Sequence, residues 1–136
     1  FLLEYEKERL WQKIKLIKKD IKSILLDQSF IAGIGNIYAS EILFDCNINP
    51  LKLGKSLNKK LFCNLLQSTE KIIKKAILKG GVSIKDYRNI SGDLGYFQIN
   101  LKVYGREGLS CYNCKSLILK IKSKGRSTFY CKNCQK

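Results

Sequence analysis

Residues 25–41 have the sequence LLDQSFIAGIGNIYASE, and the fold prediction starts from the turn at their centre, Gly33-Ile34-Gly35-Asn36. The apolar residues before this turn fit a short helix from Ile21 to about Gln28. The residues after it fit a helix to about Cys46, with a buried stripe of Ile37, Ala39, Ile42 and Leu43. Glycine permits positive φ, and a helix start presents free N–H groups to a phosphate. By itself, the pattern is equally consistent with an ordinary tight turn.

Two longer amphipathic patterns lie on either side of this pair of helices. Residues 4–19 carry acidic side chains early and lysines late, an order that balances a helix dipole at both ends. Pro50 marks a turn. Ser56 is a suitable N-cap for a long helix that continues to Ile77 and ends at Gly80-Gly81. The first part of the chain is therefore predicted to be helical.

The pattern changes from Val82 onward. Residues 83–96 are polar and predict a long loop, and a loop of that length in a compact domain is usually functional or disordered. Short strands are predicted over residues 98–104, 117–122 and 127–130. We place a boundary near residue 105, which separates a helical domain (1–105) from a small β domain (106–136).

Four cysteines form two Cys-x2-Cys pairs, one at Cys111 and Cys114 and the other at Cys131 and Cys134. Two such turns can present four thiolates to a tetrahedral Zn²⁺ at about 2.3 Å. Four thiolates close the coordination sphere, so we expect one structural zinc ion per chain and no catalytic metal. The alternative is two disulfides, which would require an oxidising compartment.

The other two cysteines, Cys46 and Cys63, lie on apolar helical faces and are expected to be buried free thiols. The predicted fold class is mainly α with a small β zinc finger. In such a finger the metal supplies folding energy that a very small core lacks.

The charge balance points to a polyanionic partner. The 136 residues include 26 Lys plus Arg against 11 Asp plus Glu, for a formal net charge of +15. This field favours nucleic acid first and an anionic membrane second. The apolar runs are far shorter than the roughly 20 residues of a spanning helix, which argues against a transmembrane protein. The absence of histidine excludes imidazole catalysis within these residues.

Positive charge is concentrated in the predicted zinc finger, where no acid follows Glu107. Most of the basic residues there are lysines, and Arg126 is the one arginine after Arg106. A planar guanidinium can hold a phosphate through two hydrogen bonds, whereas a lysine offers a point charge. The finger is therefore predicted to contact phosphate. A solvated lysine face is the alternative.

Several motifs, taken together, resemble the bacterial formamidopyrimidine-DNA glycosylase family. Residues 25–28 and 32–41 are similar to its helix-two-turns-helix DNA-binding signature. The motifs that look like its lesion loop and connector are Gly80-Gly81, Lys85-Asp86-Tyr87, Gly95-Tyr96-Phe97 and residues 103–106. Residues 125–131 and 134–136 are similar to its terminal zinc finger. Asn36-Ile37-Tyr38-Ala39 favours this family over endonuclease VIII, which shares the architecture.

The resemblance implies a DNA-binding role for Lys22, Asn36, Tyr38, Lys85 and Arg126. Asn36 would bind the phosphate beside the damaged nucleotide, and Lys22 would lie near the DNA and influence lesion processing. Lys85 would belong to a flexible lesion loop, about residues 82–97, that closes over an everted oxidised purine. Arg126 would clamp phosphates beside the lesion and act as the proton donor for δ-elimination.

The family's activity is that of a base-excision-repair glycosylase and abasic-site lyase that removes formamidopyrimidine and 8-oxoguanine and cleaves by β,δ-elimination. Its nucleophile is an N-terminal proline on a preceding domain, whereas this chain begins with Phe1 and has Pro50 as its one proline. We therefore expect a fragment that binds double-stranded DNA with an oxidised base or abasic site and has no glycosylase activity alone.

The resemblance further implies a monomer in the bacterial cytoplasm, associated with the nucleoid and with no membrane partner. The alternatives are a stand-alone nucleic-acid-binding zinc protein, an endonuclease VIII-type fragment and a ribosome-associated or RNA-binding zinc ribbon.

Overall fold

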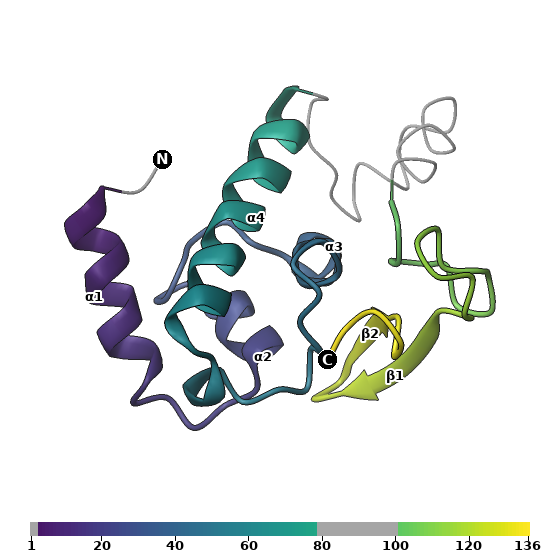
Figure 1. The fold of residues 1–136 in the computed structure, drawn as a ribbon, viewed down its shortest axis with the longest axis horizontal. Coiled ribbons are helices and arrows are strands. Elements are labelled where there is room, and N and C mark those ends of the chain that lie inside the picture. Colours follow the sequence, from purple (N-terminus) through teal and green to yellow (C-terminus); the bar gives the residue numbers. More distant parts are fainter. Residues whose placement is uncertain (1–2, 79–100) are drawn as a thin grey trace.

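The computed structural model describes residues 3–78 and 101–136. Its elements are α1 (Glu4–Ile14), α2 (Ile21–Leu26), α3 (Asn36–Asp45), the 3-10 helix η1 (Gly54–Ser56), α4 (Lys59–Leu78), β1 (Leu119–Ser123) and β2 (Arg126–Tyr130). In Figure 1, α4 runs through the middle of the view, with α1 on one side and α3 and the β1–β2 hairpin on the other. This arrangement confirms the predicted fold class, mainly α with a small antiparallel sheet.

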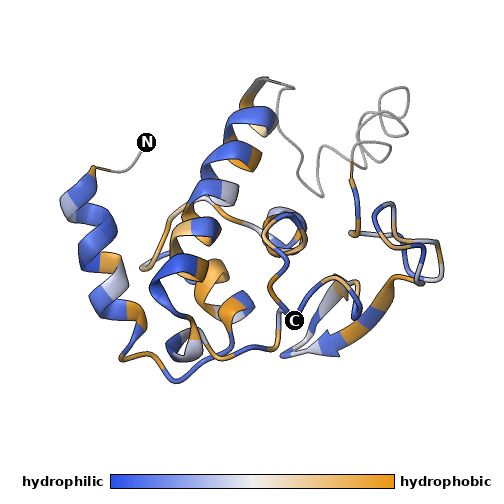
Figure 2. Cartoon of the chain, in the orientation of Figure 1, coloured by the Kyte–Doolittle hydropathy of each residue, from blue (hydrophilic) through white to orange (hydrophobic). Residues whose placement is uncertain are grey.

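One apolar core holds the helices together. It includes the buried side chains of Leu10 from α1, Ile24 from α2, Leu43 from α3 and Phe62 from α4. In Figure 2, α2 is mainly apolar, whereas α1 is mainly hydrophilic along its length. Removal of these apolar side chains from water is the main stabilising contribution to this region.

The first helix ends earlier than predicted. α1 ends at Ile14 rather than Lys19, because the chain then turns and Asp20 forms an antiparallel bridge with Leu53. Asp20 is the N-cap of α2, and its carboxylate accepts the Ser23 backbone N–H at 2.8 Å. The helical pattern after Ile14 is thus interrupted by the residue that begins the next helix.

The start of α4 also differs from the prediction. Ser56 lies in η1, where its hydroxyl donates to the Leu53 carbonyl at 2.7 Å. Asn58 precedes α4, and its side chain accepts the Leu61 backbone N–H at 2.8 Å. Asparagine is as effective an N-cap as serine, so Asn58 takes this role. The predicted helix end at Gly80-Gly81 lies outside the described residues.

Gly54 allows the loop before α4 to approach α2 closely. A Cβ atom at this buried position would overlap Ile24 Cδ1 and lie 3.2 Å from Ile14 Cγ1. Any larger side chain here would displace two core residues. The glycine is therefore required by packing rather than by backbone conformation.

The C-terminal module is a β-hairpin with a small core of its own. Leu119 of β1 lies opposite Tyr130 of β2, and Ser123 lies opposite Arg126. Lys124 and Gly125 form the turn, with φ values of 51° and 79°. The core of this module consists of Phe44 from α3 together with Val103, Cys111, Ile118, Phe129 and Cys131. The two C-terminal strands were predicted, although β1 begins at Leu119 rather than Leu117.

The strand predicted over residues 98–104 is wrong over residues 101–104, the part of it that the structure describes. Residues 101–104 do not form a strand. Glu41 of α3 accepts the backbone N–H groups of Lys102 at 2.7 Å, Val103 at 2.9 Å and Tyr104 at 2.9 Å. Leu101 and Val103 are buried, so the alternating pattern indicated burial correctly but not pairing. Residues 98–100 and the predicted loop at 83–96 lie outside the described residues.

Candidate nucleic-acid interface and metal centre

Four sulfur atoms gather in the C-terminal module. The Sγ atoms of Cys111, Cys114, Cys131 and Cys134 all lie within 4.8 Å of one another. Cys114 Sγ is 3.4 Å from Cys131 Sγ, and Cys111 Sγ is 3.8 Å from Cys134 Sγ. A disulfide would require about 2.05 Å. Four sulfurs placed tetrahedrally about 2.3 Å from one ion lie roughly 3.8 Å apart, so this cluster can hold a metal ion.

The surroundings of the sulfurs fit a structural metal site. The Asn113 N–H points to Cys111 Sγ at 3.4 Å, and the Cys134 N–H points to Cys131 Sγ at 3.5 Å. Such donors stabilise the negative charge of metal-bound thiolates. Four thiolates leave no open coordination position, which is the arrangement of structural rather than catalytic zinc.

The other two cysteines differ from each other. Cys46 is buried as predicted, and burial raises the pKa of its thiol to about 12, so it stays protonated at neutral pH. Cys63 is exposed, which corrects the prediction that it is buried. The buried stripe of α4 runs through Phe62, Leu65, Leu66 and Thr69. Cys63 lies beside this stripe rather than on it.

The C-terminal module is attached to the helical region next to its second cysteine pair. The buried side chain of Gln135 accepts the Cys131 N–H at 2.8 Å and donates to the Ile48 carbonyl at 3.0 Å. Lys136 donates its backbone N–H to the Asn47 carbonyl at 3.2 Å and accepts the Asn49 N–H at 3.1 Å. These bonds join the second cysteine pair to the loop after α3.

Two of the predicted site residues meet at β2. Lys22 Nζ from α2 donates to the Ser127 carbonyl at 3.1 Å and to Thr128 Oγ1 at 2.5 Å. Asn36, the first residue of α3, donates through Nδ2 to the same Ser127 carbonyl at 2.9 Å. The two helices that flank the glycine turn therefore bind one carbonyl of the hairpin.

The glycine turn makes this convergence possible. Gly33 has a φ of 93°, in the region that favours glycine, whereas Gly35 has a φ of −101° and is the N-cap of α3. The Gln28 side chain closes the turn by accepting the Gly33 N–H at 2.8 Å and donating to the Ile34 carbonyl at 3.2 Å. The predicted turn is present, and one of its two glycines uses the left-handed conformation.

Lys22 is a buried cation whose hydrogen-bond partners are neutral. Its residue is 5% exposed, and its ammonium group is held by a carbonyl and a hydroxyl. Burial, followed by repulsion from Arg126, lowers the pKa of Lys22 to about 8, against a smaller opposing effect of Asp20. Lys22 therefore loses its charge much closer to neutral pH than an ordinary lysine does.

Arg126 is exposed at the first position of β2. Within the described residues, no hydrogen bond or ion pair engages its guanidinium group. It borders a cleft of about 210 Å³ whose lining also includes Lys19, Lys22 and Lys124. Because Lys22 and Asn36 hold the Ser127 carbonyl, the backbone next to Arg126 is fixed. The N–H donors of the Arg126 guanidinium stay available to an anion.

The remaining predicted residues are placed differently. Asn36 Oδ1 is buried and has no hydrogen-bond partner among the residues described. Tyr38 is half-buried and packs against the helical core. Lys85 and the predicted lesion loop, residues 82–97, lie outside the described residues. The structure thus brings together Lys22, Asn36 and Arg126 of the predicted set.

Glu41 is a residue that the motif analysis did not assign to any role. It is 6% exposed, and its carboxylate accepts three consecutive backbone N–H groups at the start of the C-terminal module. Burial raises the pKa of Glu41, although these N–H groups oppose the shift. Its signal in the sequence is an acid within the otherwise apolar stretch of α3. Such an acid must find donors when it is buried.

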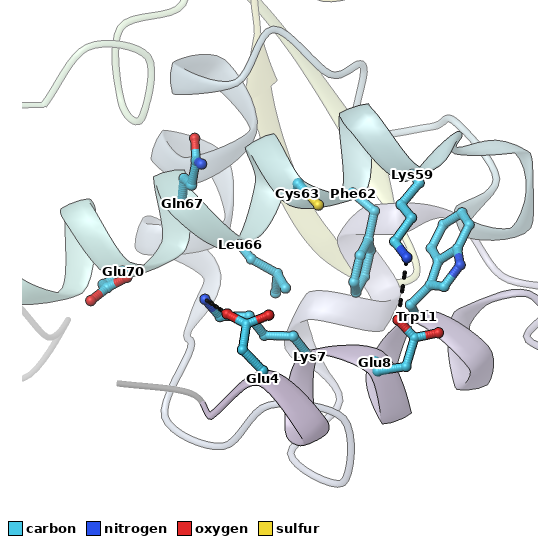
Figure 3. Close-up of a pocket in the computed structure, with 10 residues that line it drawn as sticks. All are labelled: Glu4, Lys7, Glu8, Trp11, Lys59, Phe62, Cys63, Leu66, Gln67 and Glu70. Carbon is cyan, nitrogen blue, oxygen red and sulfur yellow. Dashed lines mark hydrogen bonds and ion pairs between the residues drawn. The ribbon is translucent and has the colours of Figure 1, made fainter.

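A larger groove of about 290 Å³ lies between α1 and α4 (Figure 3). Trp11 and Phe62 contribute aromatic rings whose centroids are 5.4 Å apart. The charges of the groove are paired, since Lys59 lies 3.3 Å from Glu8 and Lys7 lies 3.4 Å from Glu4. None of the predicted site residues lines this groove. The candidate interface is therefore the junction of α2, α3 and β2.

Known proteins with similar sequences were found over the whole chain. Residues 3–88 match the family model described as "Formamidopyrimidine-DNA glycosylase H2TH domain". A formamidopyrimidine-DNA glycosylase of Rickettsia bellii (strain OSU 85-389) is 46% identical over 136 residues, which is 100% of this chain and 48% of that protein. The chain spans about half the length of the curated relatives it matches.

Two solved structures have the same fold. A complex between the Lactococcus lactis Fpg and an abasic site containing DNA gives a TM-score of 0.84 at 39% identity, covering 95% of this chain and 47% of that one. A complex between the Lactococcus lactis FPG (MutM) and a FAPY-dG containing DNA gives 0.83 at 38% identity, covering 95% and 46%. Among the described residues, no helix is long and apolar enough to cross a membrane.

Proposed function

The chain belongs to the formamidopyrimidine-DNA glycosylase family, and on this basis we propose that it is the DNA-binding part of a base-excision-repair enzyme. The full-length protein would remove oxidised purines, formamidopyrimidine and 8-oxoguanine, and nick the abasic strand by β,δ-elimination. The observation that carries this proposal is the convergence of Lys22, Asn36 and Arg126 at one hairpin of a chain with a net charge of +15. The two solved relatives bound to abasic-site and FAPY-dG DNA support the same class of partner.

The proposal divides the chain into two parts. Residues 1–105 form a helix-two-turns-helix domain that includes a lesion loop at about 82–97, and residues 106–136 form a zinc finger with four cysteine ligands. Lys85 acts in the lesion loop, and Tyr38 contributes to DNA binding from α3. The protein works as a monomer at the bacterial nucleoid.

One Zn²⁺ is the metal that suits the four cysteines. Cys111, Cys114, Cys131 and Cys134 would hold it, and the ion would fix the hairpin without taking part in bond cleavage. Through Gln135 the loaded site is tied to the loop after α3, and through Ser127 the hairpin is tied to α2 and α3. The metal thus serves DNA binding by holding Arg126 in place.

Arg126 is the residue that contacts the strand. Its guanidinium group holds a phosphate beside the lesion through two parallel hydrogen bonds, and it donates the proton for δ-elimination at the same place. Asn36 stands at the start of α3, where free N–H groups attract a neighbouring phosphate. Lys22 adds positive charge behind the hairpin while it supports the Ser127 carbonyl.

These residues bind DNA but do not break the glycosidic bond on their own. The family resemblance assigns the nucleophile to an N-terminal proline, and the one proline here is Pro50, which is buried in the loop after α3. The pocket that accepts the everted base also needs the preceding domain, because a base leaves the stack only at a cost of a few kcal/mol.

The test is the affinity of the zinc-loaded chain for a duplex with a tetrahydrofuran abasic-site analogue, compared with an undamaged duplex and a structured RNA. We expect preference for the lesion duplex and a steep decrease of affinity with salt. Arg126→Ala should weaken binding about tenfold, because hydrogen bonds to charged groups contribute roughly 1.5–3 kcal/mol.

Lys122→Ala is the matched control, since Lys122 is an exposed lysine of β1. Equal small effects of the two substitutions would contradict the role of Arg126, and preference for RNA would support an RNA-binding zinc ribbon instead. Borohydride trapping on an abasic duplex should give no covalent product with this chain and a product with the full-length protein.

A further inference from the structure

Lys124, at the turn of the hairpin, reaches back to α2. Its Nζ lies 3.3 Å from Asp20 Oδ2 and 3.0 Å from Ser23 Oγ. Asp20 also accepts the Ser23 backbone N–H and hydroxyl, both at 2.8 Å. The turn and the start of α2 therefore share one hydrogen-bonded cluster of three side chains.

The acceptor in this cluster is held firmly. The Asp20 side chain is 16% exposed, and its backbone is bridged to Leu53. The next residue, Ile21, donates its N–H to the Lys52 carbonyl at 2.7 Å. Partial burial acts to raise the pKa of Asp20, but the bonds from Ser23 and Lys124 outweigh it and leave the pKa below its usual value. Asp20 is thus a fixed, ionised anchor at neutral pH.

Arg126 lies between two attachments of the hairpin to the helical region. On its N-terminal side, beyond Gly125, Lys124 is bound to Asp20. On its C-terminal side, Ser127 is bound to Lys22 and Asn36. A flexible turn with one attachment would allow Arg126 many orientations, whereas two attachments reduce the ordering cost when an anion binds.

We propose that Asp20 is a positioning residue for DNA binding, which holds the hairpin turn through Lys124 and thereby orients Arg126. This inference rests on the proposed function of Arg126 as the phosphate-binding residue. Asp20 lines the same cleft as Arg126, so its negative charge by itself repels phosphate and weakens DNA binding. Charge alone and positioning therefore predict opposite effects when Asp20 is neutralised.

The central experiment is Asp20→Asn in the zinc-loaded chain, with binding to the tetrahydrofuran duplex measured across a salt series. Asparagine keeps the oxygen that accepts the Ser23 backbone N–H and so keeps the N-cap of α2. It replaces the charged Oδ2 acceptor, which Lys124 and the Ser23 hydroxyl share, with an NH2 group. We expect affinity to fall about threefold, the range of an exposed ion pair. Lys124→Gln should show a similar loss, and Lys124→Arg should retain binding.

Lys122→Gln is the control for removal of one hairpin charge, and the double variant Asp20→Asn with Lys124→Gln tests coupling. The double variant should bind no more weakly than Lys124→Gln alone. In an Arg126→Ala background, Asp20→Asn should no longer weaken binding, because only the repulsion between Asp20 and phosphate is then removed. Amide hydrogen exchange at residues 124–126 of the free protein should increase in Asp20→Asn and stay unchanged in Lys122→Gln.

The outcomes separate this inference from the proposed function. Equal or tighter binding by Asp20→Asn, together with a large loss in Arg126→Ala, would overturn the positioning role and leave the DNA-binding function in place. If Arg126→Ala binds as tightly as the parent chain, both are wrong.

Discussion

The helical region and the C-terminal module differ in the apolar core that each of them buries. The helical region buries a continuous apolar core in which Ile14, Leu25, Leu43 and Leu65 are completely inaccessible to solvent. The core of the C-terminal module is small, and two of its buried members, Cys111 and Cys131, belong to the four-sulfur cluster. Apolar burial contributes about 25 cal/mol per Å², so we expect a core of this size to depend on the additional energy of metal ligation. We therefore expect two sources of stability, the helical core and the metal site, that can be removed separately.

The largest expected effect is the loss of the metal site. Cys131→Ser should release the metal and unfold the hairpin, because structural zinc supplies about 10–16 kcal/mol in zinc-finger peptides. Helical circular dichroism should persist, while hairpin NMR signals disappear and DNA affinity falls at least tenfold (roughly 1.4 kcal/mol). Cys63→Ser, at the exposed cysteine, is the control and should change nothing. Retention of metal and of the hairpin signals by Cys131→Ser would disprove the metal assignment.

The second prediction concerns a substitution that weakens the helical core and leaves the four cysteines unchanged. Phe62 is 2% exposed, and Phe62→Ala should lower the free energy of unfolding by about 3–5 kcal/mol, as large-to-small core substitutions do. Urea denaturation measures this loss, and metal content at low urea should stay at one ion per chain. Gln67→Ala, an exposed position on α4, is the control. Loss of the metal at urea concentrations where the helices are still folded would show that the regions are not separable in this way.

A smaller effect is expected where the regions are joined by Glu41. Glu41→Gln replaces one of the two accepting carboxylate oxygens with an NH2 group, so at least one N–H group of residues 102–104 loses its acceptor, which should cost about 1–3 kcal/mol. Amide exchange at Val103 should increase more than exchange in α4. The matched control is Glu107→Gln, which removes an exposed ion pair of 3.4 Å with Lys120 and should cost less than about 1 kcal/mol. Equal effects of the two substitutions would contradict a joining role for Glu41.

The smallest predicted effect is a pH dependence at the same junction. The folded-state pKa of Lys22 is lowered to about 8, so the unfolded chain binds more protons than the folded chain from there up to the ordinary lysine pKa. This group therefore adds stability as pH rises through that window, because the cost of a buried charge disappears. DNA affinity should move in the opposite direction and fall about two- to threefold between pH 7 and 9 as the positive charge is lost. In Lys22→Gln this change of DNA affinity between pH 7 and 9 should be absent. A change of equal size in the variant would show that another group titrates.

The sequence was most informative where one residue type has few structural uses. The Cys-x2-Cys pairs predicted the sulfur cluster, because closely spaced thiols in two turns rarely serve another purpose. A glycine turn was predicted between two helices, and the structure has α2 and α3 on either side of it with Gly33 in the left-handed conformation. The predicted roles in DNA binding remain predictions.

Features that depend on tertiary partners could not be read from local patterns. The strand expected at 101–104 is absent, because Glu41, distant in sequence, binds its N–H groups. Cys63 sits one position off the buried stripe of α4, a difference that apolar periodicity does not resolve. The burial of Lys22 against Thr128 joins residues far apart in the chain, so its lowered pKa has no sequence signal.

The position of the aromatic side chains has a practical consequence. Trp11 is the one tryptophan of the chain, and it packs against Phe62 of α4, with the Lys15 ammonium 4.5 Å from its ring centroid. Indole fluorescence therefore reports on the contact between α1 and α4, because the finger contains no tryptophan. Unlabelled protein thus contains a built-in optical probe for separation of α1 from α4, and this probe lies outside the four-cysteine cluster.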